Sequence, residues 1–269
     1  MITWNAKPLN IFMKRKNLLH KGTHIKEDSM GAKRSARKGR HHGNVVQIQQ
    51  FLPHKQKDVK IIPRNKNQED YMLKLLDLKK DIVFGVGPAG TGKTLLAVQV
   101  AIKMFKEKVV DKIIVTRPVV SVDEDLGFLP GSLEEKMAPW TRPIFDVLRE
   151  YFTAREISGM IEEGIIEISP LAYMRGRTFK RAFILADEMQ NTTANQMKML
   201  LTRLGTGSYM AVTGDLAQTD RIKDNGLLDF IQCYSTHSGS SRLAMTSFNH
   251  VDIERHRAVR EVLEIYGDV

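Results

Sequence analysis

A run of glycines, a lysine and a threonine with spacing suited to holding phosphate lies between positions 87 and 94. It reads Gly87-Pro88-Ala89-Gly90-Thr91-Gly92-Lys93-Thr94. Glycines let backbone N–H groups turn inward and approach phosphate oxygens closely. We expect the Lys93 ammonium to contact the β- and γ-phosphates of a nucleotide, and the Thr94 hydroxyl to ligate Mg²⁺. The spacing therefore predicts a complete phosphate-binding loop (P-loop) rather than a glycine-rich turn that matches by chance.

A pair of acidic residues at the end of an apolar segment would supply the second half of such a site. Phe183-Ile184-Leu185-Ala186 is followed directly by Asp187 and Glu188. An apolar strand that delivers Asp-Glu at its carboxyl end is typical of the Walker B motif, at the sheet edge where open α/β folds bind ligands. We expect Asp187 to belong to the Mg²⁺ shell and Glu188 to orient and polarise an attacking water. The alternative is an acidic pair that caps the exit of a strand.

Two glutamines are candidates for contacts with other parts of a nucleotide. Gln218 follows the expected strand end Thr213-Gly214-Asp215, and we interpret it as a sensor of the γ-phosphate that Asp215 helps to position. A turn built from these residues is the alternative. Gln68 lies 19 residues before Gly87 on an expected helix. Its amide can bond to both N6 and N7 of adenine and so select ATP over GTP; alternatively, it is an exposed glutamine at a helix start.

Alternating strands and helices, expected from residue 61 onward, must position these groups. Short apolar segments separated by helical periodicity favour a three-layer α/β fold, with a mainly parallel sheet and helices on both faces. The helix that follows the P-loop would add the positive end of its dipole to the phosphate site. The expected strands are 82–86, 112–116, 165–168, 182–186, 209–213 and 242–246, and the expected helices are 68–78, 94–108, 132–151, 155–162, 193–204, 225–234 and 252–266.

Basic residues are concentrated before this region. Residues 1–60 hold 14 Lys and Arg against three acidic residues, whereas residues 61–269 hold 27 against 28. The net charge of +10 therefore belongs to the N-terminal segment. We expect residues 1–60 to form a disordered basic tail, because they are poor in periodic apolar positions, and residues 61–269 to form the globular domain. The tail either binds the phosphate backbone of RNA or DNA, or is a solvated extension.

The composition argues against two classes of protein. A single cysteine, Cys233, excludes an internal disulfide framework, so a reducing compartment, the cytoplasm, is expected. No apolar run approaches the roughly 20 residues that span a bilayer, so a membrane protein is not expected. The basic N-terminal segment also lacks the apolar stretch of a secretory signal.

With these residues in place, the chain resembles the PhoH family of phosphate-starvation-inducible ATP-binding proteins over about residues 60–269. The most specific segments are Gly-Phe-Leu-Pro-Gly at 127–131 and Tyr-Met-Arg-Gly-Arg-Thr at 173–178. The full set, in family order, is the P-loop, Thr116-Arg117-Pro118, Leu126–Gly131, Pro170–Thr178, Asp187-Glu188 with Gln190–Thr193, Gln196–Arg203, and Val212–Asp215 with Gln218 and Asp220.

The resemblance implies one RecA-like domain related to the N-terminal motor half of superfamily 1 helicases. Such a protein would bind ATP and Mg²⁺, hydrolyse ATP, in some members unwind RNA, and assemble into hexameric rings. The resemblance supports Gln68 as the adenine reader and implies that Gln190 couples the nucleotide state to motion. A single lobe cannot close its own site, so an arginine from a neighbouring subunit would complete it. Arg255 is the first candidate and Arg257 the second.

Some features leave alternatives open. Arg175 and Arg177 flank Gly176 and either contact phosphates of RNA or ATP, or pair with acids across a subunit interface. Met189 stands where the family usually has a smaller residue, and Arg257 where it usually has proline. Some members carry a nuclease or RNA-binding module, but the basic tail does not imply nuclease activity. The alternative function is an ATP-dependent conformational or assembly switch without unwinding activity.

Overall fold

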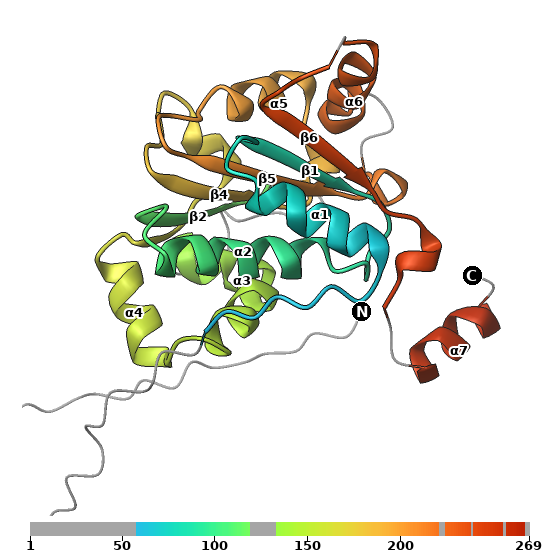
Figure 1. Ribbon diagram of the computed structural model, residues 1–269, viewed down its shortest axis with the longest axis horizontal. Helices are drawn as coiled ribbons and strands as arrows, with labels where there is room; N and C mark the ends of the chain where they lie inside the picture. Colours follow the sequence, from blue (N-terminus) through green and yellow to red (C-terminus); the bar gives the residue numbers. More distant parts are fainter. Residues whose placement is uncertain (1–57, 119–132, 221–223, 238, 255–256, 267–269) are drawn as a thin grey trace, which may run out of the picture. The chain divides into compact units, whose positions relative to one another are not determined.

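Six strands form one sheet in the computed structural model of the chain. They are β1 (Ile82–Val86), β2 (Lys112–Thr116), β3 (Ile166–Ile168), β4 (Ala182–Ala186), β5 (Tyr209–Gly214) and β6 (Leu243–Ser247). All neighbouring strands run parallel, in the spatial order β3-β2-β4-β5-β1-β6 (Figure 1). The structure describes residues 58–118, 133–220, 224–237, 239–254 and 257–266, so the expected tail lies outside the described residues except for residues 58–60.

The strands are continuous apolar runs because helices cover both faces of the sheet. Every residue of β1 and of β4 is buried, as expected for parallel strands that meet water on neither face. The P-loop follows β1, which pairs with β5, and β5 pairs with β4. The carboxyl ends of these three strands therefore meet at one edge, where open α/β sheets bind their ligands.

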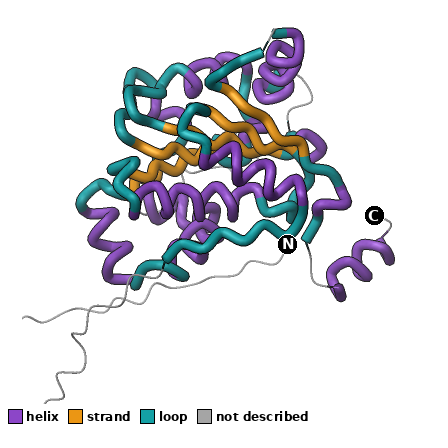
Figure 2. The backbone as a smooth tube through the Cα atoms, viewed as in Figure 1, coloured by secondary structure: helices purple, strands orange, loops and turns teal. Residues whose placement is uncertain are grey.

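The helices form a layer on each side of the sheet (Figure 2). One layer holds α1 (Lys66–Leu76), α2 (Lys93–Lys106), α3 (Leu133–Arg149) and α4 (Ala154–Glu162), and the other holds α5 (Ala194–Leu201) and α6 (Gly226–Thr236). Side chains alternate between the two layers along each strand: Ile113 and Val115 of β2 join the first core, and Ile114 the second. The expected three-layer α/β fold is confirmed. No helix among the described residues is long and apolar enough to cross a membrane.

The last expected helix begins later than predicted. The sequence predicts a helix over 252–266, but α7 spans Arg257–Tyr266. Asn249 instead starts a short 3-10 helix, η6 (His250–Asp252), where its side chain accepts from the N–H of Val251 at 3.0 Å and its own N–H donates to Asp252 Oδ2 at 2.8 Å. These local bonds compete with an α-helical start.

Gly85, in the middle of β1, allows α1 to approach the sheet. An added Cβ would lie 2.7 Å from Cζ and 2.9 Å from Cε2 of Tyr71. That ring is fully buried and packs edge-on against Phe248, with ring centroids 5.6 Å apart. Because the ring has no space to move into, we expect Gly85→Ala to lower the free energy of unfolding by about 1–3 kcal/mol, as overpacking usually does. Denaturant unfolding measures this change.

Gly159→Ala is the matched control for Gly85→Ala. Gly159 lies in α4, and an added Cβ would meet nothing within 4 Å. Alanine there should leave stability unchanged or raise it by about 0.5–1 kcal/mol, because it lowers the conformational entropy of the unfolded chain. Equal losses in the two variants would contradict the packing explanation.

Candidate functional site

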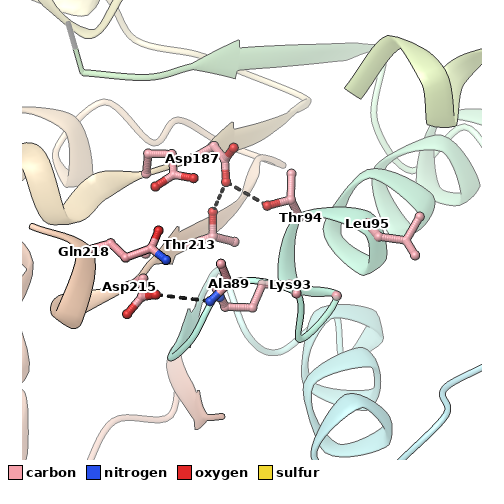
Figure 3. A pocket seen from close by; sticks show the side chains of 12 residues that line it. Ala89, Lys93, Thr94, Leu95, Asp187, Thr213, Asp215 and Gln218 are labelled. Carbon is pink, nitrogen blue, oxygen red and sulfur yellow. Dashed lines mark hydrogen bonds between the residues drawn. The ribbon is translucent and has the colours of Figure 1, made fainter. Parts of the chain in front are cut away.

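A pocket of about 240 Å³ opens at the carboxyl ends of β1, β4 and β5 (Figure 3). It brings together the P-loop, the acidic pair and the region of Gln218, which are far apart in the sequence. The lining residues are Ala89, Gly90, Gly92, Lys93, Thr94, Leu95, Asp187, Glu188, Thr213, Gly214, Asp215 and Gln218. The structure therefore places these groups at a common site.

Glycines allow the P-loop to turn sharply between β1 and α2. Gly87 has a φ of 144°, and Gly90 and Gly92 each have a φ of 82°, values that residues with side chains rarely adopt. The segment after β6 lies directly against this loop. An added Cβ at Gly87 would lie 2.3 Å from the carbonyl oxygen of Phe248, and the N–H of Glu254 donates to the carbonyl oxygen of Gly90 at 3.0 Å.

The Lys93 ammonium is folded back onto the P-loop at the start of α2. Its Nζ donates to the carbonyl oxygens of Gly87 at 2.6 Å and Pro88 at 2.7 Å, and it lies 3.3 Å from the hydroxyl oxygen of Thr91. An ammonium has three N–H donors, so oxygens of the loop occupy all of them. Phosphate oxygens are the stronger acceptors that could replace these contacts.

Three carboxylates face the Lys93 ammonium. Burial lowers the pKa of Lys93, and the charges of Asp215, Glu188 and Asp187 act in the opposite direction. Asp215 is buried, and its Oδ2 accepts a hydrogen bond from the N–H of Ala89 at 3.1 Å (Figure 3). An amide of the P-loop therefore already binds an anionic oxygen, which is the property that phosphate binding requires.

Oxygen atoms around Asp187 form the part of the pocket suited to a divalent cation. The Thr94 hydroxyl donates to Asp187 Oδ1 at 2.8 Å, and the Thr213 hydroxyl donates to the same oxygen (Figure 3). Hydroxyl and carboxylate oxygens are ligands that Mg²⁺ accepts. These residues therefore fit a Mg²⁺ ion, with Thr94 and Asp187 as its predicted ligands.

Thr213 is a site residue that the sequence indicated only as part of a strand end, without a role of its own. Its place in β5 provides a signal that could have found it. Alternate residues of a strand face opposite sides of a sheet, and Ala211 lies in the same core as α2. Thr213, two residues further on, therefore faces the same side at the carboxyl end of the strand next to β4.

Glu188 has an unusual backbone conformation. Its φ of 56° lies in the left-handed region, which costs a non-glycine residue roughly 1–2 kcal/mol and is found preferentially at functional sites. Its carboxylate accepts from Gln190 Nε2 at 2.5 Å, and Gln190 Oε1 accepts from the N–H of Asp215 at 3.1 Å. Gln190 therefore connects the acidic pair to the P-loop partner Asp215.

The two glutamines proposed to contact a nucleotide occupy different environments. Gln218 is exposed and lines the pocket. Gln68 is only 4% exposed: its Nε2 donates to the carbonyl oxygen of Thr91 at 3.0 Å, and its Oε1 accepts from the N–H of Arg64 at 2.9 Å. Burial excludes the alternative of an exposed helix residue. The amide retains one N–H and one lone pair for a further partner, and its contact with adenine stays a prediction.

Some residues singled out in the sequence lie away from the pocket. Thr116 ends β2, but its hydroxyl is fully buried, does not line the pocket and has no hydrogen-bond partner among the described residues. Both terminal nitrogens of Arg177 bond to the carboxylate of Glu167 in β3, so this arginine pairs with an acid of its own chain. Arg255 and the segment Leu126–Gly131 lie outside the described residues.

Residues 60–267 match the family described as PhoH-like protein. A PhoH-like protein of Bacillus subtilis (strain 168) is 41% identical over 252 residues, which cover 93% of this chain and 77% of that protein. One of Mycobacterium tuberculosis (strain H37Rv) is 46% identical over 209 residues, which cover 77% of this chain but only 58% of that protein. Among solved structures, the Sulfolobus solfataricus SWI2/SNF2 ATPase core in complex with dsDNA has a TM-score of 0.39 at 17% identity, covering 65% of this chain and 36% of that chain.

Proposed function

Because the chain belongs to the PhoH-like protein family, we propose that it binds ATP with Mg²⁺ and hydrolyses the ATP in a reaction coupled to RNA or single-stranded nucleic acid. One observation supports the hydrolytic site above all others. Asp187 accepts from Thr94 of the P-loop and from Thr213, and its charge acts on Lys93. The acidic pair and the phosphate-binding loop thus belong to one electrostatic unit.

Several pocket residues have specific parts in this proposed reaction. Lys93 and the amides of the P-loop bind the phosphates, while Thr94 and Asp187 would hold Mg²⁺, which neutralises charge on the phosphate oxygens when bound. Glu188 orients the attacking water and accepts its proton. Gln218, at the exposed side of the pocket, senses the γ-phosphate. Catalysis of this kind rests on positioning and on fixed charges.

The adenine and the open side of the site require further groups. Gln68 lies against the P-loop, a position that supports its role as the adenine reader. An arginine from a neighbouring subunit would stabilise the charge that develops on the γ-phosphate, and Arg255 is the candidate. We propose a ring of six subunits in which each subunit completes the site of its neighbour, as the family resemblance implies.

Single-stranded RNA is expected to raise the ATPase rate severalfold. In the structure, Lys93 is bonded to carbonyl oxygens of its own P-loop. A nucleic acid that binds beside the pocket would favour the hydrolysis-competent arrangement over this one. The measurement is the steady-state ATPase rate of the full chain against a panel of RNA and DNA strands of equal length. Absence of ATP hydrolysis with and without every strand would contradict the proposal.

A nucleotide-dependent switch without unwinding is the second candidate, and one set of hydrogen bonds favours it. The hydroxyl of Thr219 donates to the carbonyl oxygen of Gln190 at 3.0 Å and accepts from Asn225 Nδ2 at 3.0 Å, and Asn225 caps α6. Hydrogen bonds therefore connect Glu188 to α6 through Gln190, Thr219 and Asn225. A change at Glu188 could be transmitted to α6 along this path. ATP-driven displacement of a labelled strand supports a motor, whereas an ATP-dependent change of assembly without displacement supports a switch.

A further inference from the structure

An exposed tyrosine and an exposed arginine lie near each other on the loop that follows β3. The 3-10 helix η3 (Leu171–Met174) buries Leu171 and Met174 in the core, a spacing of three that matches one turn of such a helix. The residues between them face outward, and Tyr173 is 63% exposed. Arg175, the next residue but one, is also exposed.

Arg175 lies at an exposed position in a tight turn. Arg175 has φ −59° and ψ 133°, Gly176 has a φ of 79°, and the N–H of Arg177 donates to the carbonyl oxygen of Met174 at 3.2 Å. This is a type II turn with glycine at the position that requires a positive φ. Arg175 makes no hydrogen bond or ion pair with any described residue.

Arg177 stabilises this loop and is already paired. Its guanidinium bonds to both carboxylate oxygens of Glu167 in β3 and lies over the ring of Phe179, 4.6 Å from the centroid. A planar, two-point contact of this kind fixes geometry as well as charge. This ion pair connects the loop to β3, and Arg175 is the arginine of the two that is available for a ligand.

Basic residues lie on the elements that contact η3. The carbonyl oxygen of Arg117, just after β2, accepts from the N–H of Leu171 at 3.2 Å. Helix α5 packs against η3 and carries the exposed Lys198. Within the described part of the chain, Arg117, Arg175 and Lys198 have no ion pair, whereas the acid Glu167 is neutralised by its arginine. Positive charge that has no ion pair among the described residues favours a polyanion as the ligand.

We propose that Tyr173 and Arg175 form a contact site for single-stranded nucleic acid, in which the tyrosine stacks on a base and the arginine binds an adjacent phosphate. The inference rests on the proposed function and gives the nucleic acid a position on the fold. Proteins that hold single strands combine positive charge along the backbone with exposed aromatic rings, because every base has a stacking face. Tyr173 with Arg175, Arg117 and Lys198 supplies this combination.

Two backbone hydrogen bonds connect this site to the nucleotide pocket. The N–H of Asp187 donates to the carbonyl oxygen of Thr116 at 2.9 Å, and the N–H of Leu171 donates to that of Arg117 at 3.2 Å. Thr116 and Arg117 are consecutive, so one dipeptide at the end of β2 contacts both the pocket and η3. A nucleic acid bound at η3 would therefore act on the acidic pair through this dipeptide.

Equilibrium binding of fluorescently labelled single-stranded RNA to the full chain tests the stacking contact. Tyr173→Ala should weaken binding about tenfold, and Tyr173→Phe, which keeps the ring, should bind as the wild type does. An oligonucleotide that lacks its bases should bind the wild type and Tyr173→Ala equally. A merely structural role for Tyr173 would weaken both ligands, and the melting temperature of each variant identifies a folding defect.

Salt dependence of the same binding tests the phosphate contact. Arg175→Ala should reduce the slope of log K against log salt concentration by about 0.7, the value for one phosphate contact to a single strand. Arg155→Ala is the matched control, because Arg155 is an exposed arginine on α4, outside this surface, and should leave the slope unchanged. An equal change in both variants would contradict a specific contact at Arg175.

The outcomes separate this site from the proposed function. If RNA stimulates the wild type and the concentration for half-maximal stimulation rises about tenfold in Tyr173→Ala, the site is supported. If RNA binds and stimulates every variant as it does the wild type, the site is wrong and the proposed function stands. If the variants change the oligomeric state while RNA affinity stays constant, the surface is a protein interface and the inference fails. If the wild type hydrolyses ATP but binds no single strand, the inference and the proposed coupling fail together.

Discussion

Glu188→Gln is expected to retain ATP binding and to slow hydrolysis by about 10²- to 10⁴-fold, the usual contribution of a positioned general base. The amide has the shape of the carboxylate but cannot accept the proton of the attacking water. Its oxygen can still accept the hydrogen bond from Gln190 Nε2, so the arrangement around Asp215 should persist. Single-turnover hydrolysis and equilibrium binding of ATP measure the two effects separately.

Glu162→Gln is the matched control, because Glu162 is an exposed glutamate at the end of α4 that does not line the pocket. It should leave both the hydrolysis rate and ATP affinity unchanged. Near-normal hydrolysis by Glu188→Gln would show that another group activates the water. Loss of ATP binding in that variant would show that Glu188 supports the loop rather than the chemical step.

The same variant tests completion of the site by a neighbouring subunit. Subunits with Glu188→Gln keep Arg255, and subunits with Arg255→Ala keep Glu188. If the arginine acts on the adjacent subunit, a mixture of the two inactive proteins should regain ATPase activity. No recovery at any mixing ratio would count against this geometry.

Lys93→Ala is expected to weaken ATP binding roughly ten- to a hundredfold, since hydrogen bonds to charged groups contribute about 1.5–3 kcal/mol each. The Lys93 ammonium is the cation at the centre of the P-loop, and removing it leaves Asp215, Glu188 and Asp187 to repel the phosphates. Calorimetry or a fluorescent nucleotide measures the change in affinity. ATP hydrolysis should be lost as well, because the cation also neutralises charge in the transition state.

Lys103→Ala provides the comparison for this prediction. Lys103 lies on the same helix but pairs at its surface with Glu107, so its removal should leave ATP affinity unchanged.

The pH dependence of ATP binding gives a separate test of Lys93. Burial lowers the pKa of Lys93, and only the protonated amine attracts phosphate. ATP affinity of the wild type should therefore begin to fall at a lower alkaline pH than an ordinary lysine would give. Unchanged affinity in Lys93→Ala would refute the assigned role of the P-loop lysine.

Sequence patterns are sufficient to predict the bounds of those strands that depend on local composition. The bounds of β1, β2 and β4 agree with prediction, because each strand is a short apolar run that ends at glycine or at polar residues. The P-loop and the Asp-Glu pair follow two of these strands directly, so their positions at the carboxyl edge follow from the topology alone. The family resemblance is confirmed by the match over residues 60–267.

Contacts between distant side chains could not be predicted in the same way. Periodicity indicates that Gln68 lies on a helix, but not that its amide meets the carbonyl of Thr91. It likewise does not reveal that Thr213 supports Asp187, or that Glu188 has a left-handed backbone. The late start of α7 depends on competition between the side-chain caps of η6 and the helix propensity of the same residues. Their free energies differ by too little for a sequence pattern to resolve the start of the helix.

The contacts that Gly87 and Gly90 make with the segment after β6 have a consequence for any longer protein that contains a domain of this fold. The first helix also reaches the P-loop, through Gln68, so α1 and the segment after β6 both contact this loop. The M. tuberculosis relative extends well beyond the matched region, which covers 58% of it. A further module joined to such a fold before α1 or after η6 would therefore be tethered to a segment that contacts the P-loop. Mechanical load on that tether would reach the P-loop without first crossing the sheet.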